Sequence, residues 1–181
     1  AVLAVATAGV VVMLFAFPYG IDLDGYRTGA QDFLDGASIY GPMPQLAEGA
    51  HLPFTYPPIA AALFTVFAVV PLWAASFLLT ITSIACLALT LRIVIGAVSA
   101  RPSLEVWWLV VGAMAAGLWL APVQETLTYG QINIVLMALV VVDAMWGQSR
   151  WWGGALVGIA IAIKLTPAVF LLLFLLRRQW R

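Results

Sequence analysis

Residues 73–97 read WAASFLLTITSIACLALTLRIVIGA, a long apolar run that only Arg92 interrupts. About 20 apolar residues in a helix cross the roughly 30 Å hydrocarbon core of a bilayer. This run by itself therefore predicts a transmembrane helix. The rest of the chain has the same character, because 64% of its 181 residues are hydrophobic and only 9% are charged. A soluble domain is about half apolar and about a quarter charged, so the composition predicts an all-α, polytopic membrane protein.

Three other segments have the composition of a membrane span or of part of one: residues 2–17, 104–121 and 134–147. Two further apolar segments are irregular. Residues 58–70 are too few for an ordinary span, and residues 153–177 are broken in the middle by KLTP (164–167). Proline removes a backbone donor and disfavours the helical conformation in the residue before it. We therefore expect short and broken helices beside the regular spans.

The positions of Lys and Arg predict the orientation, because cytoplasmic loops carry an excess of these residues. The polar loop at 18–57 has one Arg against five acids, so we expect this long first loop to be extracytoplasmic. The basic residues expected on the cytoplasmic side are Arg92, Arg101, Arg150, Arg177, Arg178 and Arg181. If all these basic residues are cytoplasmic, segment 58–70 must be a short re-entrant or interfacial helix. Segment 153–177 must then be a hairpin of half-helices that turns at KLTP, and residues 122–133 must lie outside. The alternative counts 58–70 as a thin but complete span, which reverses every later segment.

Charge and rare residues exclude several kinds of function. The formal net charge is zero and no basic patch is present, so the chain lacks the signature of nucleic-acid binding. Cys86 is the only cysteine and His51 the only histidine, which excludes an intramolecular disulfide and a Cys or His metal cluster. We predict no metal and no cofactor. The sequence lacks an initiating Met and stops at RRQWR (177–181), so we expect residues 1–181 to be the N-terminal part of a single, longer transmembrane domain.

The acidic stretch GIDLDGYRTGAQDFLDG (20–36) lies beside the first apolar segment. Asp32 and Asp35 fit an ordinary solvated loop, but Asp22 lies only a few residues from that segment. Partial desolvation at a membrane–water boundary favours proton uptake by a carboxylate, which suits a general base acting on a sugar hydroxyl. We also expect a short helix around 24–35. One apolar face of this helix would contain Tyr26, Ala30, Phe33 and Leu34.

Two further patches combine polar and aromatic side chains. PFTYPPIAA (53–61) fits a helix start with interfacial aromatic residues, so Phe54 and Tyr56 have a structural interpretation as well as a binding one. QETLTYGQIN (124–133) has more polar side chains than a tight turn requires. Amides and a carboxylate together offer donors and acceptors for sugar hydroxyls. We predict a binding role for this patch, whose polar side chains include Glu125, Tyr129, Gln131 and Asn133.

Lys164 lies between apolar runs in AIAIKLTPAVF (160–170). An ionisable residue in such a place is costly and is by default a functional candidate. One interpretation is that Lys164 captures a phosphate, with Thr166 adding a hydroxyl. The other interpretations are a buried ion pair with Asp143 and snorkelling of the side chain to the membrane interface. The sequence leaves these alternatives open.

The segments DLDGYR, FLDGASIYG, FTYPPIAAALF, TLTYGQIN and GIAIAIKLTPAVFLL, in this order, resemble the actinobacterial polyprenol-phosphate-mannose-dependent α-(1→2)-mannosyltransferases. These are membrane glycosyltransferases of the GT-C type. The resemblance runs from about residue 10 to the end. It implies a GT-C-like multi-span helical fold in the plasma membrane, with an extracytoplasmic active site. It also implies a polyprenyl-phosphate-mannose donor, a glycolipid or lipoglycan mannoside acceptor, and inversion at the anomeric carbon.

The resemblance also assigns site residues. The first Asp of the family's D-L-x-x-Y pattern falls on Asp22, which would be the catalytic base, and the Tyr falls on Tyr26. Asp24 occupies a variable position, so we favour Asp22 over Asp24. From their chemistry alone, we expect Lys164 or Arg27 to stabilise the departing phosphate, with no metal needed. The predicted substrate-binding residues are Asp24, Tyr26, Arg27, Tyr56, Glu125, Gln131, Asn133 and Lys164.

Two rival functions fit part of the sequence. A multi-span transporter of a small polar or lipid-linked solute would also use broken helices and intramembrane charges. No internal repeat supports that interpretation, and the acidic loop is long for a connection in a transporter. A scaffold or flippase accessory protein is a third alternative, and it predicts that changes at Asp22 and Glu125 are tolerated.

Overall fold

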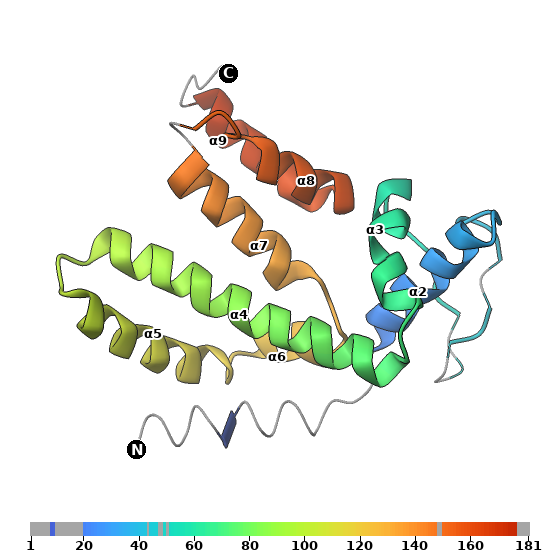
Figure 1. Ribbon diagram of the computed structural model, residues 1–181, viewed down its shortest axis with the longest axis horizontal. Coiled ribbons are helices and arrows are strands. Elements are labelled where there is room, and N and C mark those ends of the chain that lie inside the picture. The colour runs from blue at the N-terminus through green and yellow to red at the C-terminus, as the bar shows by residue number, and fades with distance from the viewer. Residues whose placement is uncertain are drawn as a thin grey trace.

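The computed structural model describes residues 8–9, 20–42, 44–46, 49, 51–147 and 150–176. The expected first span at 2–17, apart from residues 8 and 9, and the basic end at 177–181 therefore lie outside the described residues. Every element from α2 onward is a helix (Figure 1). In chain order these are α2 (Ile21–Leu34), α3 (Pro58–Ala68), α4 (Leu72–Val98), α5 (Ser103–Gly117), α6 (Ala121–Thr128), α7 (Asn133–Val142), the π-helix η1 (Asp143–Gly147), α8 (Ala155–Ile163), the 3₁₀-helix η2 (Thr166–Phe170) and α9 (Leu171–Leu176).

The predicted span at 73–97 is confirmed as α4. Its 27 residues have a length of about 40 Å at about 1.5 Å per residue, enough to cross a bilayer. Among the described residues, α4 is the one unbroken helix that is long and apolar enough to do so. Figure 1 shows α4 lying between α5 and α7, and it packs against both. Helix α7 in turn packs against α8.

The predicted span at 104–121 is broken. Helix α5 ends at Gly117, α6 begins at Ala121, and their axes are bent by 76°. Pro122 lies in the first turn of α6, where its missing N–H and fixed φ start a helix but cannot continue one. The expected end of this span at residue 121 was therefore wrong. The first half of the polar patch at 122–133 is helical.

The length of helix α3 bears on the two alternatives for segment 58–70, a short helix or a complete span. Its 11 residues have a length of about 16 Å, roughly half of a bilayer core. Pro58 starts the helix, and Pro71 follows its end closely. This length favours the short re-entrant or interfacial helix over the thin complete span.

Helices α7 and α8 are antiparallel neighbours, as two sets of contacts show. At one end, the buried Asp143 accepts hydrogen bonds from the N–H groups of Gly154 (2.7 Å) and Val157 (2.9 Å) in the first turn of α8. At the other end, Lys164 after α8 donates to Asn133 at the start of α7. This excludes one of the open alternatives for Lys164, an ion pair with Asp143, because the two residues lie at opposite ends of α8. The carboxylate instead caps that helix.

The predicted break at KLTP is confirmed. Helix α8 ends at Ile163, Lys164 is extended with φ −148° and ψ 133°, and η2 begins at Thr166. Pro167 explains the break, because it cannot donate to the preceding turn. Element η2 then packs against α7, and its residues Thr166, Pro167 and Phe170 line a groove with that helix. The chain thus turns at Lys164 and places that side chain at a break between helices.

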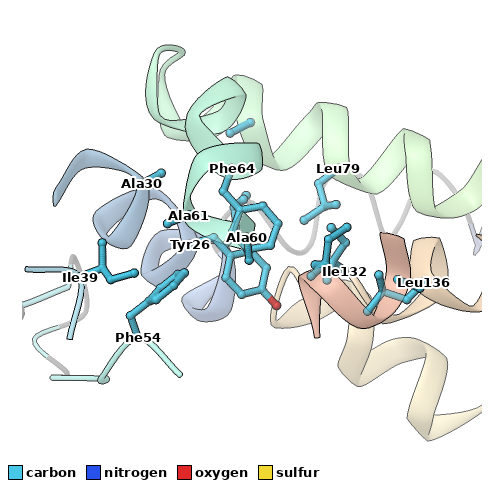
Figure 2. Packing of buried hydrophobic residues seen from close by; sticks show 14 of the residues in the cluster. Tyr26, Ala30, Ile39, Phe54, Ala60, Ala61, Phe64, Leu79, Ile132 and Leu136 are labelled. Carbon is cyan, nitrogen blue, oxygen red and sulfur yellow. The ribbon is translucent and has the colours of Figure 1, made fainter. Parts of the chain in front are cut away.

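The core joins the acidic segment to the membrane helices. Tyr26 of α2 stacks on Phe64 of α3 with ring centroids 4.5 Å apart, and both side chains are buried. Figure 2 shows this pair packed beside Ile132, with the Tyr26 hydroxyl at the edge of the cluster. The apolar face predicted for α2 is right in its first half. Its second half is wrong, because Phe33 and Leu34 are exposed where the last turn of α2 extends beyond α3 (Figure 1).

Candidate active site

Four side chains form a continuous series of hydrogen bonds, which we call the polar relay: Asp22, Gln131, Asn133 and Lys164. Gln131 Nε2 donates to Asp22 Oδ2 at 2.6 Å. Asn133 Nδ2 donates to Gln131 Oε1 at 2.7 Å. Lys164 Nζ donates to Asn133 Oδ1 at 2.9 Å. The relay thus joins the start of α2, the start of α7 and the end of α8.

The two ends of the relay fix the orientation of the amides between them. A lysine ammonium can only donate, and an ionised carboxylate can only accept. Asn133 must therefore turn its oxygen to Lys164, which leaves its NH₂ to donate to Gln131. Gln131 in turn must direct its NH₂ to Asp22. All three hydrogen bonds run from the cation toward the anion, so the relay is a single polarised unit.

A close approach of two backbone segments brings Asp22 to Gln131. The Asp22 N–H donates to the carbonyl of Tyr129 at 2.9 Å. A Cβ on Gly20 would lie 2.9 Å from the Cα of Gly130, so the two glycines are close because neither has a side chain. Gly130 also has φ +67°, a conformation that glycine adopts without strain. This contact sets the start of α2 on the turn before α7.

Two tyrosines support the cationic end of the relay. The ammonium of Lys164 lies 5.5 Å from the ring centroid of Tyr56, within the range of a cation–π interaction. The hydroxyls of Tyr56 and Tyr26 are 3.0 Å apart. Burial, and then the neighbouring Tyr56, raise the pKa of Tyr26 well above its usual value, so its phenol stays protonated. The pair therefore fixes the Tyr56 ring beside Lys164.

Two hollows adjoin the relay, one at Asp22 and one at Asn133. The Asp22 pocket, about 220 Å³, is lined by Asp22, Gly25, Tyr26 and residues 52–56. The α7 groove, about 370 Å³, is mostly apolar. Its lining residues are Asn133, Leu136, Met137, Val140, Val141, Thr166, Pro167 and Phe170. A carboxylate faces one hollow, and the amide bound to the lysine faces the other.

The structure brings six of the predicted residues together: Asp22, Tyr26, Tyr56, Gln131, Asn133 and Lys164. It places the others elsewhere. Asp24 and Arg27 line a different pocket, with Thr28, Gln31 and Asp32. Arg27 also donates to the carbonyls of Phe67 and Val70 at the end of α3. Glu125 is exposed on α6.

Sequence reasoning missed two structural elements of the site. It gave Gly20 and Gly130 no role, although both occur next to residues that it selected. It also did not foresee that Tyr26 and Tyr56 would share a hydrogen bond. A glycine beside each of two candidate polar residues was the available signal for a close backbone approach. Within the described part of the chain, no group of three or more His, Cys, Asp or Glu side chains is placed to hold a metal ion.

The fold and the site define a helical membrane protein with a polar site at a helix break. The sequence profile described as Glycosyltransferase family 87 matches residues 54–181, and the chain belongs to this family. Three of the four relay residues fall within the matched region: Gln131, Asn133 and Lys164. No solved structure matches the chain.

Curated relatives confirm the resemblance found in the sequence. The chain is 43% identical over 176 residues to the polyprenol-phosphate-mannose-dependent alpha-(1-2)-phosphatidylinositol mannoside mannosyltransferase of Mycobacterium tuberculosis, covering 91% of this chain and 41% of the relative. It is 42% identical to the protein of that name in Mycolicibacterium smegmatis, with 92% and 41% covered. It is 39% identical to the phosphatidylinositol pentamannoside mannosyltransferase of the same species, with 88% and 38% covered. The chain thus spans about two fifths of the length of these relatives.

Proposed function

We propose that the protein containing this chain transfers mannose from polyprenyl-phosphate-mannose to a phosphatidylinositol mannoside or a related glycolipid. The family and the names of the relatives support the donor and the class of acceptor. The observation that carries the proposal is the polar relay, which links a carboxylate to an ammonium group across three helices. A carboxylate can act as the base for the acceptor hydroxyl, and an ammonium can stabilise the departing phosphate.

Asp22 acts as the general base in this proposal. Gln131 bonds Oδ2 of the carboxylate, so we assign Oδ1 to the acceptor hydroxyl in the Asp22 pocket. The hydroxyl proton passes to Asp22 as the hydroxyl oxygen forms a bond to the anomeric carbon. The bond from that carbon to the phosphate oxygen breaks, and its electron pair leaves with polyprenyl phosphate. A single displacement of this kind inverts the configuration.

Lys164 stabilises the departing phosphate. Its ammonium has three N–H donors, of which Asn133 uses one. The other two are available to phosphate oxygens, where negative charge accumulates as the bond breaks. The neutral ring of Tyr56 holds the ammonium in place without neutralising its charge.

The proposal places the reaction on the extracytoplasmic side of a multi-pass, GT-C-like protein. The long first loop, with one Arg against five acids, supports that side. The 11 residues of α3 agree with this arrangement, because they are too few for an ordinary membrane span. Residues 1–181 would form the N-terminal part of one transmembrane domain, and the rest of the protein would supply its remaining spans.

The test is transfer of labelled mannose from polyprenyl-phosphate-mannose to glycolipid in vesicles that contain the whole protein. Asp22→Asn should lower transfer by about 100-fold to 10,000-fold, the usual contribution of a general base. Asp32→Asn, a matched change ten positions along the same helix, should leave transfer unchanged. Activity close to wild type in Asp22→Asn would overturn the assignment. Saturable solute uptake without transfer would instead support a transporter.

A further inference from the structure

We propose that the α7 groove holds the first part of the polyprenyl chain of the lipid-linked donor, with its phosphate at the Lys164 end. This inference rests on the proposed function, since it assigns a position to a substrate of that reaction. The groove is not accounted for by the polar relay or by the Asp22 pocket. It meets the relay at one residue, Asn133.

The polarity of the groove changes along its length. Its two polar lining residues, Asn133 and Thr166, are the first residues of α7 and η2. The other lining residues are apolar: Leu136, Met137, Val140, Val141, Pro167 and Phe170. The α7 positions recur at the spacing of one helix face. From Asn133 to Val141 this face is about 12 Å long at about 1.5 Å per residue. The groove therefore suits a molecule with a polar head and an apolar tail.

The positive charge of Lys164 at the polar end of the groove favours a bound molecule with an anionic head. Among the described residues, the partners of the Lys164 ammonium are the amide oxygen of Asn133 and the ring of Tyr56, and both are neutral. None of the described residues that line the groove is acidic. A cation without an acidic partner beside an apolar surface gains most from a bound anion. Thr166, two residues after Lys164, adds a hydroxyl at the same end.

The arrangement selects the donor rather than the acceptor as the occupant. In a polyprenyl phosphate the phosphate is bonded directly to the hydrocarbon chain. The groove likewise begins directly beside the cationic end of the relay. In a phosphatidylinositol mannoside, by contrast, sugars, inositol and glycerol separate the reacting hydroxyl from the acyl chains. Only the donor brings the reacting phosphate and the apolar chain together in the way that this site does.

The test compares two donors that have the same mannosyl phosphate head, one with a long polyprenyl chain and one with a short, water-soluble chain. In the whole protein, Val141→Trp fills the groove, and Val142→Trp makes the same change at the next position, outside the groove lining. We expect Val141→Trp to raise KM for the long-chain donor at least tenfold and to leave kcat/KM for the short-chain donor nearly unchanged. Val142→Trp should affect the two donors equally.

A binding measurement separates this inference from the proposed function. Polyprenyl phosphate with a diazirine near its phosphate end should crosslink to α7 and η2 in the wild type and much less in Val141→Trp. Crosslinks confined to other segments, or an equal loss with both donors, would overturn the inference and indicate that another helix of the protein covers the groove. Absence of transfer from either donor by the wild type would overturn the proposed function, while the crosslinks would still report on the groove.

Discussion

The side chain of Gln131 donates a hydrogen bond of 2.6 Å to the carboxylate of Asp22, which lies 109 positions earlier in the sequence. This contact holds one carboxylate oxygen of Asp22, a residue that also lines the Asp22 pocket. Through Asn133 the same contact connects Asp22 to Lys164.

Gln131 is a positioning residue for Asp22. A hydrogen bond to a charged group contributes about 1.5–3 kcal/mol, which corresponds to about a tenfold to a hundredfold change in rate. Gln131→Ala should therefore lower kcat by that factor, with a small effect on KM for the donor. Gln124→Ala on α6 is the matched control. A rise in KM without a fall in kcat would show that Gln131 binds substrate instead of orienting the base.

Lys164 should act through its charge. Lys164→Met keeps most of the side-chain length but removes the ammonium, so we expect at least a hundredfold loss of transfer, since it removes a charge aimed at the departing phosphate. Lys164→Arg should retain part of the activity. Steady-state transfer assays in membranes measure both variants. Equal activity in the Met and Arg variants would contradict a role for the charge.

Asp143 should affect stability independently of Lys164. Asp143→Ala leaves two N–H groups at the start of α8 without their acceptor, so we expect a loss of about 1–3 kcal/mol in the free energy of unfolding. Unfolding of the detergent-solubilised protein measures this loss. The double variant with Lys164→Met should be additive within about 0.5 kcal/mol, as for separate sites. A larger coupling energy would indicate that Asp143 and Lys164 interact directly, contrary to the structure.

Gly130 should be intolerant of a side chain. A Cβ at this position would lie 2.8 Å from the Cβ of Leu23, and the backbone has φ +67°. Gly130→Ala should lower stability by more than about 1 kcal/mol and should also reduce transfer, because it separates Asp22 from Gln131. The control is Gly112→Ala in α5, where a Cβ meets nothing within 4 Å. That change should be neutral or stabilising, since alanine favours a helix. Retention of full activity by Gly130→Ala would show that the close approach is not needed.

The fold was largely predictable because its signals are local. The apolar run at 73–97 determines α4, and prolines determine the start of α3 and the break at KLTP. The bend between Gly117 and Ala121 was missed because Pro122 follows a run that is apolar throughout. The exposed second half of α2 was missed for another reason: helical periodicity predicts a face, but not how far the neighbouring helix extends along it.

The candidate site was predictable in its residue types but not in its connections. Lys164 was selected because a charge between apolar runs is costly, and Asp22 for its position beside the first apolar segment. Gln131 and Asn133 were selected because amides suit sugar hydroxyls. The sequence did not indicate that these four residues bond to one another, and it offered Asp143 as an alternative partner for Lys164. Only the antiparallel packing of α7 and α8 shows that Lys164 bonds Asn133 and not Asp143.

The sequence by itself determined that this is a helical membrane protein, that one of its breaks falls at KLTP, and which polar side chains interrupt its apolar segments. These properties follow from composition and from interactions within a few residues. Only the tertiary structure decided which polar groups meet. A hydrogen bond forms over about 3 Å, and its partners here are brought within that distance by the close approach of Gly20 and Gly130 and by the packing of α8 on α7. Those contacts depend on the whole buried arrangement, which no short stretch of the chain encodes.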